Sequence, residues 1–294
     1  MHTTPASWLE GTPQGKQARE LLSRCVHCGF CLPACPTYRL LGNELDSPRG
    51  RIYLIKQLVE GEQQTGTISG HLDRCLTCRA CEAACPSGVQ YGRLVDLGRE
   101  LLESTARRGT GTRVTRWLLT ETLSRRRLVS GGIGFARALG PLVPAALRSR
   151  IPPPAPRAAR SGSDGSHPRR VVLLEGCVQP GLRPEINAAA ARVLDRLGIT
   201  VMQAEREACC GALCHHLGRH ERALGQIRST LDSFAAALDR GAEAIVSTTS
   251  ACGLMVKEYA TLLQDDPRSS ALAQRISAAT RDLSELIDPR DRAR

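Results

Sequence analysis

A cysteine pattern that occurs twice constrains this chain more than any other feature. The first copy runs from Cys25 to Pro36 and the second from Cys75 to Pro86, and both read C-x2-C-x2-C-x3-C-P. This is a spacing that holds iron–sulfur clusters: three cysteines of one loop bind one cluster, and the fourth, before the proline, binds the other. Two complete copies therefore predict two 4Fe-4S clusters.

The spacing also predicts which cysteines bind which cluster. We expect cluster A at Cys25, Cys28, Cys31 and Cys85, and cluster B at Cys75, Cys78, Cys81 and Cys35. A single copy could instead bind zinc through two C-x-x-C pairs. A zinc-dependent protein that binds nucleic acid through its arginines is therefore an alternative from a different functional class. The proline after each fourth cysteine and the low aromatic content of 3% argue against nucleic-acid binding.

Cysteine usage and charge predict where the protein works. Thirteen cysteines without a signal peptide indicate a reducing compartment, in which thiols serve metals rather than disulfides. No apolar run approaches the ~18 residues that cross a bilayer. We expect a soluble, cytoplasmic protein, at most peripheral on the inner face of the plasma membrane. The net charge of +11 is concentrated in residues 105–170, where fourteen arginines face only Glu121 and Asp164 as acids.

Hydrophobic periodicity divides the chain into three expected parts, of the α+β multidomain class. Residues 1–105 read as an α-helical ferredoxin-type domain with two 4Fe-4S loops. Residues 106–170 read as a basic helical arm and a Pro/Arg-rich linker, and 171–294 as one α/β module. The arm is expected to pack on its own protein, or else to contact anionic lipid or an acidic partner.

Local signals add detail to these parts. Residues 1–14 are expected to be loosely ordered. Ser47 and Pro48 indicate an N-cap and the first residue of a helix, and Gly131-Gly132 indicates a break in the arm. In the last part we expect strands at 171–175, 199–202 and 244–247, and helices at 186–197, 219–238, 254–263 and 271–287. This alternation predicts a parallel sheet.

A second group of cysteines follows the expected strands. Cys177 follows the first strand, Cys209 and Cys210 the second, and Cys252 the third. Because parallel strands end at one edge of a sheet, these thiols are expected to meet in a third metal or iron–sulfur site. The alternative is inert packing as small hydrophobic residues. The nearby Cys214 and the histidines His215, His216 and His220 are expected to lie outside the site, the histidines solvated, and His27 is expected to form local hydrogen bonds.

With these residues in view, the chain resembles the iron–sulfur subunits of bacterial glycolate oxidase (glycolate dehydrogenase). The resemblance covers nearly everything except the linker and is carried by residues 25–36, 41–56, 71–87, 174–180, 191–199, 209–211 and 256–259. It implies that 171–294 is a cysteine-rich (CCG) module. It also implies an oxidoreductase complex in which FAD-containing partner subunits oxidise glycolate to glyoxylate. This chain would carry the electrons toward a quinone or other membrane acceptor and would contain no substrate-oxidising or catalytic residue itself.

The resemblance also shows departures and leaves alternatives. Such modules usually read C…CCG…CxxC, whereas here Thr249 stands at the first position of the last pair and Cys252 at the second. Subunits of this family carry two modules, and this sequence ends after the first, so we expect the second to be lacking. One alternative is the iron–sulfur subunit of another flavin dehydrogenase, such as anaerobic glycerol-3-phosphate dehydrogenase or a heterodisulfide-reductase-like enzyme. The other is a truncated, non-catalytic cluster-binding protein.

Overall fold

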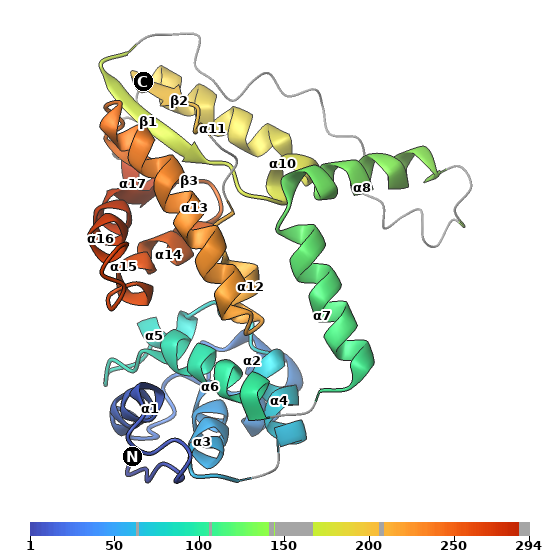
Figure 1. The fold of residues 1–294 in the computed structure, drawn as a ribbon, viewed down its shortest axis with the longest axis vertical. Coiled ribbons are helices and arrows are strands. Elements are labelled where there is room, and N and C mark those ends of the chain that lie inside the picture. Colours follow the sequence, from blue (N-terminus) through green and yellow to red (C-terminus); the bar gives the residue numbers. More distant parts are fainter. Residues whose placement is uncertain (63–64, 106–107, 141–143, 145–166, 206–208, 288–294) are drawn as a thin grey trace. The chain divides into compact units, whose positions relative to one another are not determined.

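The structure is a computed structural model that describes residues 1–62, 65–105, 108–140, 144, 167–205 and 209–287 (Figure 1). The chain forms two compact units. The first comprises Met1–Arg113 with His216–Gly218, and the second comprises Val114–His215 with Arg219–Arg294. The fold has the expected class, a helical ferredoxin-type part followed by a cysteine-rich α/β part. Residues 106–107, 141–143 and 145–166 of the expected arm and linker lie outside the described residues.

The first unit is built from short helices between the cysteine loops. They are α1 (Pro13–Ser23), α2 (Pro36–Leu41), the 3-10 helix η1 (Glu44–Asp46), α3 (Pro48–Val59), α4 (Thr65–Asp73), α5 (Ala80–Ala83) and α6 (Tyr91–Thr105). Helix α3 begins as the sequence predicts: the Ser47 hydroxyl accepts a hydrogen bond from the Gly50 N–H at 2.9 Å, and Pro48 follows the cap. Helix α6 contacts α1, α3 and α4, so these helices share one apolar core.

The N-terminal segment is ordered, so the expectation for residues 1–14 was wrong. Leu9 is buried in the core of the first unit. The Met1 amino group donates hydrogen bonds to the carbonyl oxygens of Ser23 (3.1 Å) and Cys25 (3.2 Å). Composition alone suggested a polar tail, but one buried leucine and these backbone contacts fix the segment beside the first cysteine loop.

The second unit contains a four-stranded parallel sheet in the order β2-β1-β3-β4. The strands are β1 (Arg169–Leu174), β2 (Ile199–Met202), β3 (Ala244–Ser247) and β4 (Thr280–Asp282). The helices are α10 (Gln179–Leu182), α11 (Pro184–Arg196), α12 (Ala212–His216), α13 (His220–Asp239), α14 (Ser250–Lys257), α15 (Tyr259–Leu262), α16 (Ser270–Ala279) and α17 (Leu283–Leu286). Successive residues of β1 point to opposite faces: Val171 packs with α11, and Val172 with α13 to α16.

Strand β4 corrects the expectation of one helix over 271–287. Helix α16 ends at Ala279, and Thr280 then pairs with Ile245 of β3. The strand is only three residues long and reads Thr-Arg-Asp. Such a short polar edge strand lacks the apolar run by which the other strands are recognised.

The basic arm contains two helices, α7 (Thr110–Leu123) and α8 (Arg126–Ala138). The helical structure is interrupted at Ser124 and Arg125, whereas α8 continues through Gly131-Gly132. The expected position of the break was therefore wrong. A helical glycine costs only about 1 kcal/mol relative to alanine, which packing of α8 on α10 through the buried Val129 can offset. Across the described helices, none has the length and hydropathy of a membrane span.

Candidate metal centres

The two cysteine loops of the first unit have the same backbone conformation. In the first, His27 and Gly29 have φ angles of 56° and 86°; in the second, Thr77 and Arg79 have φ angles of 53° and 58°. These residues occupy equivalent positions between the cysteines. Left-handed backbone at non-glycine residues costs about 1–3 kcal/mol each and is concentrated at functional sites. The two loops therefore keep strained backbone at equivalent positions, between the cysteines.

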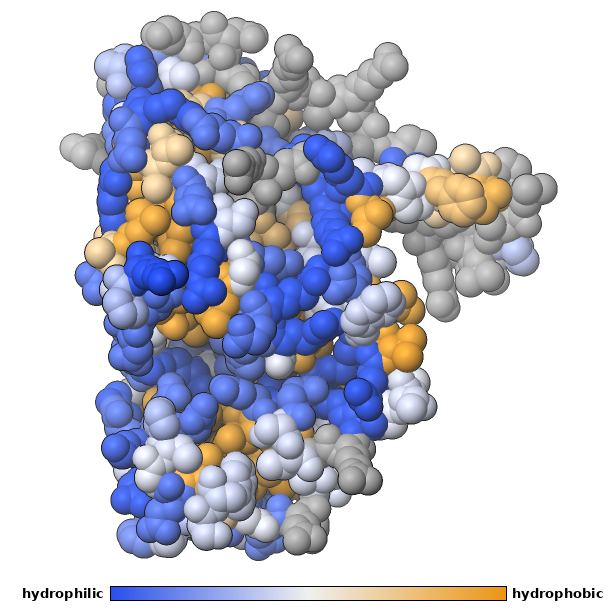
Figure 2. All heavy atoms as spheres, in the orientation of Figure 1, coloured by the Kyte–Doolittle hydropathy of each residue, from blue (hydrophilic) through white to orange (hydrophobic). Residues whose placement is uncertain are grey.

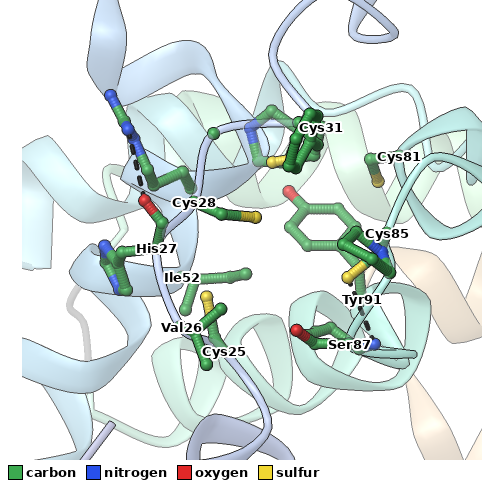
Figure 3. Close-up of a pocket in the computed structure, with 16 residues that line it drawn as sticks. Cys25, Val26, His27, Cys28, Cys31, Ile52, Cys81, Cys85, Ser87 and Tyr91 are labelled. Carbon is green, nitrogen blue, oxygen red and sulfur yellow. Dashed lines mark hydrogen bonds between the residues drawn. The ribbon is translucent and has the colours of Figure 1, made fainter.

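The first loop and the end of the second loop line a hollow that is open to solvent. Figure 3 shows four side chains that point toward one another in it, those of Cys25, Cys28, Cys31 and Cys85. Three come from one loop and the fourth from the other. The all-thiol donor set fits an iron–sulfur cluster, for which cysteine thiolates are the usual ligands.

A second hollow of about 290 Å³ is lined by the remaining cysteines of the two motifs, Cys35, Cys75, Cys78 and Cys81. Its donor set again combines three residues of one loop with one of the other. Pro48, Cys81 and Tyr91 line both hollows, so the two sites share a wall. The structure thus brings together both groups of cysteines that the sequence suggested.

Burial affects the protonation of these thiols. It raises the pKa of Cys25, Cys31 and Cys81 above the ordinary value for a thiol. Because thiolates rather than thiols bind metal, loading of these sites must release protons. The eight cysteines are all free of disulfides, as metal ligation requires.

A buried ionic network lies next to the second hollow. Asp46 is 1% exposed and accepts hydrogen bonds from Arg51 (3.3 Å) and Arg74 (3.0 Å), and its other near partner is His71 Nδ1 at 2.9 Å. Burial raises the pKa of Asp46, but the His71 hydrogen bond and the charges of Arg74 and Arg51 outweigh it and lower the pKa overall. Arg51 itself is 1% exposed and lies 3.9 Å from the Cys35 sulfur.

Sequence reasoning missed this network and the place of Tyr91 in the wall that the two hollows share. Asp46 and Arg51 lie in the distinctive 41–56 segment, which was the signal that could have identified them. His27 forms a local hydrogen bond through its backbone N–H, which donates to the Cys25 sulfur, whereas its buried Nε2 has no hydrogen-bond partner among the described residues. Its backbone carbonyl instead accepts from Arg49 at 3.4 Å.

The third cysteine group also comes together, in the second unit. The sulfurs of Cys177 and Cys209 are 3.6 Å apart, and Cys210 is hydrogen-bonded to both Cys209 and Cys252. Hydrogen bonding with Cys177 and Cys210 lowers the pKa of Cys209, and hydrogen bonding with Cys210 lowers the pKa of Cys252. The cysteines are therefore a connected thiol cluster rather than separate packing residues, at the edge where β1, β2 and β3 end.

Neighbouring groups support or border this cluster. The Tyr259 hydroxyl donates to the Cys210 carbonyl at 2.8 Å, and Thr230 donates to the Cys209 carbonyl at 2.9 Å. His215, which was expected to be solvated, is instead buried and packs edge-on against His220 with ring centres 5.2 Å apart. Cys214 is buried as well.

An arginine-lined hollow of about 1370 Å³ opens in front of Cys177 and Cys209. Its wall includes the arginines Arg125, Arg126, Arg127 and Arg222. Glu121 and Glu175 offset part of this charge, through contacts of 2.6 Å to Arg222 and 2.5 Å to Arg126. The approach to the third cysteine group is therefore basic.

Comparisons with known proteins agree with this arrangement. Residues 21–89 match the 4Fe-4S dicluster domain family, and residues 171–257 match the cysteine-rich domain family. The glycolate oxidase iron-sulfur subunit of Escherichia coli (strain K12) is 44% identical over 287 residues, which are 98% of this chain and 70% of that protein. The probable glycolate oxidase iron-sulfur subunit of Bacillus subtilis (strain 168) is 32% identical, over 91% of this chain and 65% of that protein.

More distant relatives match a smaller part. Lactate utilization protein A of Bacillus cytotoxicus is 29% identical over 118 residues, 40% of this chain and 47% of that protein. No solved structure matches the chain. The high identity to the Escherichia coli subunit over nearly the whole chain, together with both domain matches, establishes the relationship. The chain belongs to the family of glycolate oxidase iron–sulfur subunits.

Proposed function

We propose that the chain is the electron-transfer subunit of a glycolate oxidase and holds two 4Fe-4S clusters. Cluster A is bound by Cys25, Cys28, Cys31 and Cys85, and cluster B by Cys75, Cys78, Cys81 and Cys35. The observation that carries this proposal is the pair of adjacent, cysteine-lined hollows, each of which is lined by the first three cysteines of one loop and by the fourth cysteine of the other. The ferredoxin-type domain extends over residues 1–105, the arm and linker over 106–170, and the cysteine-rich module over 171–294.

The chemistry of the whole complex is divided between subunits. Oxidation of glycolate to glyoxylate releases two electrons and two protons, which FAD in partner subunits accepts. Iron–sulfur clusters take electrons one at a time, so this chain passes them on singly toward a quinone or another membrane acceptor. The residues of this chain bind the clusters and set their potentials. The names of the relatives and their oxidoreductase family support this division.

The second unit adds a third centre at Cys177, Cys209, Cys210 and Cys252. The thiol cluster and its basic approach support a metal or iron–sulfur centre there. Four cysteines are a sufficient ligand set for either kind of site.

A peripheral membrane contact is also proposed, through α7 and α8. Val114, Trp117 and Leu118 of α7 are 55%, 51% and 46% exposed. Figure 2 shows apolar surface in the region of these helices. Six arginines and one glutamate occupy residues 110–138, so the arm joins exposed apolar groups to positive charge. That combination fits the surface of an anionic bilayer.

The function is tested by glycolate-dependent reduction of a soluble quinone. The chain is co-expressed with the flavoprotein subunits, and the complex is purified without oxygen. We expect Cys28→Ser and Cys78→Ser to lower the rate at least tenfold, because each removes a cluster ligand, whereas Cys214→Ala retains it. Lactate, the alternative substrate suggested by the distant relatives, serves as the second substrate. A rate unaffected by both ligand variants would refute the electron-transfer role. Faster turnover with lactate than with glycolate would identify lactate as the substrate.

A further inference from the structure

The two hollows differ in what contacts their sulfurs. In the first, sulfurs accept from backbone N–H groups, those of His27, Arg49 and Val89. The second also has two side-chain hydroxyl groups: the Tyr91 hydroxyl donates to the Cys75 sulfur at 3.6 Å, and the Thr37 hydroxyl lies 3.2 Å from the Cys35 sulfur. These hydroxyls distinguish two sites whose backbone loops are otherwise alike.

The orientation of the Thr37 hydroxyl follows from its neighbours. Arg51 Nη1 donates to Thr37 Oγ1 at 3.0 Å, so the oxygen lone pair is used and its proton points elsewhere. A cysteine that binds iron has lost its proton and can only accept. In the structure the Thr37 hydroxyl donates to the Asp46 carbonyl at 3.0 Å, and the Cys35 sulfur at 3.2 Å competes for the same proton. Once Cys35 binds iron, its charged sulfur attracts a donor more strongly than a neutral carbonyl in a buried setting.

Charged side chains near the second hollow act in the same direction as these hydroxyl groups. Arg51 is held in place by hydrogen bonds to the His71 carbonyl (2.8 Å), Thr37 and Asp46. The network around it contains two guanidinium groups, of Arg51 and Arg74, against the one carboxylate of Asp46. Around the first hollow, Arg49 is paired with Glu44 at 2.8 Å, and its side chain is 34% exposed to screening solvent. Arg74 is itself 51% exposed, so the cation that acts on the second site with little screening is Arg51, whose side chain is 1% exposed.

We propose that Thr37, Arg51 and Tyr91 give cluster B a higher reduction potential than cluster A. Reduction adds one negative charge to a cluster, and hydrogen-bond donors and nearby cations stabilise that added charge. When a single electron enters the pair, it resides on the cluster bound by Cys35, Cys75, Cys78 and Cys81. This inference rests on the two-cluster proposal above and identifies which cluster is the acceptor within the chain.

Two nearly isosteric variants test the inference. Tyr91→Phe removes only the hydroxyl that contacts Cys75, and Thr37→Val removes only the hydroxyl between Arg51 and Cys35. Each is measured on the whole chain, purified without oxygen, by an EPR-monitored redox titration. In the unaltered chain we expect two reduction steps; in each variant the step at higher potential shifts to lower potential, and the other stays in place.

The control is Tyr53→Phe, which removes the hydroxyl of a tyrosine that is 48% exposed on the same helix as Arg51. It should leave both steps unchanged. Iron and sulfide are measured on every sample before titration. Full cluster content with both steps unmoved in both variants, or a shift of the lower step instead, would overturn the inference. Absence of clusters from the unaltered chain would instead overturn the proposed function on which it rests.

Discussion

At the scale of single residues, Cys35 and Cys85 link the two cysteine loops. Each follows the three cysteines of its own loop but lines the hollow of the other. If both hollows hold clusters, each cluster crosslinks two segments far apart in sequence. Exchange of a fourth cysteine should then affect the cluster of the opposite loop.

This crossed ligation predicts which variants resemble each other. Cys85→Ser should change the same EPR component as Cys28→Ser, because both residues are ligands of cluster A. Cys35→Ser should likewise match Cys78→Ser. Spectra of the four dithionite-reduced proteins, normalised to iron content, provide the comparison. Uncrossed ligation would give the reverse pairing, Cys35 with Cys28 and Cys85 with Cys78.

The eight motif cysteines could be found from the sequence because their spacing is itself the signal for a cluster loop. The residues around them could not. Asp46 and His71 meet only because η1 and α4 pack together, and Tyr91 approaches Cys75 from the start of α6. A contact that depends on tertiary packing has no fixed spacing along the chain.

At the scale of elements, the junction of η1 and α3 places Arg51 and Asp46 beside the second hollow. Gly50 makes this junction possible: a Cβ there would lie 2.0 Å from the Glu44 carbonyl oxygen. Backbone atoms cannot move aside as the end of a side chain can. The start of α3 and the preceding turn therefore require glycine.

Exchange of this glycine should lower stability. Gly50→Ala is expected to reduce the free energy of unfolding by about 1–3 kcal/mol, the usual cost of overpacking. Gly70→Ala, inside α4 with open space where the new methyl group would lie, is the matched control. It should raise stability by about 0.4–1 kcal/mol. Urea unfolding of both cluster-loaded variants measures the difference; equal midpoints would contradict the proposed tight contact at Gly50.

The elements themselves were predicted unevenly. Helices α3, α11 and α13 and the three apolar strands follow clear periodic patterns or apolar runs. Strand β4 was not predicted, because its three residues are polar and depend on β3 for pairing. The break in the arm was misplaced because glycine weakens a helix without ending it, and packing on α10 decides the outcome.

At the scale of the whole molecule, the chain combines a 4Fe-4S dicluster domain and a cysteine-rich domain with a basic arm. The match to two domain families shows that both parts belong to known types of module. The chain spans 70% and 65% of the lengths of its Escherichia coli and Bacillus subtilis relatives. Glycolate oxidation is therefore proposed for the whole complex. Cluster binding, in contrast, can be tested on this chain alone.

The proposed membrane contact of the arm can be tested by tryptophan fluorescence. The chain has two tryptophans, so a Trp8→Phe background leaves Trp117 of α7 as the reporter. Vesicles of phosphatidylglycerol and phosphatidylcholine should shift its emission to shorter wavelength, and added salt should reverse the shift by screening the arginines. Arg113→Gln with Arg116→Gln should weaken binding severalfold. An equal shift with purely phosphatidylcholine vesicles, or none with either, would rule out the electrostatic contact.

The most direct test of the central claim is the iron, acid-labile sulfide and zinc content of the anaerobically purified chain, with low-temperature EPR after dithionite reduction. The two-cluster account predicts about eight irons per chain, matched by sulfide, and two interacting reduced clusters. Iron clearly above this value would add a centre at Cys177, Cys209, Cys210 and Cys252. Zinc without sulfide would contradict the electron-transfer function.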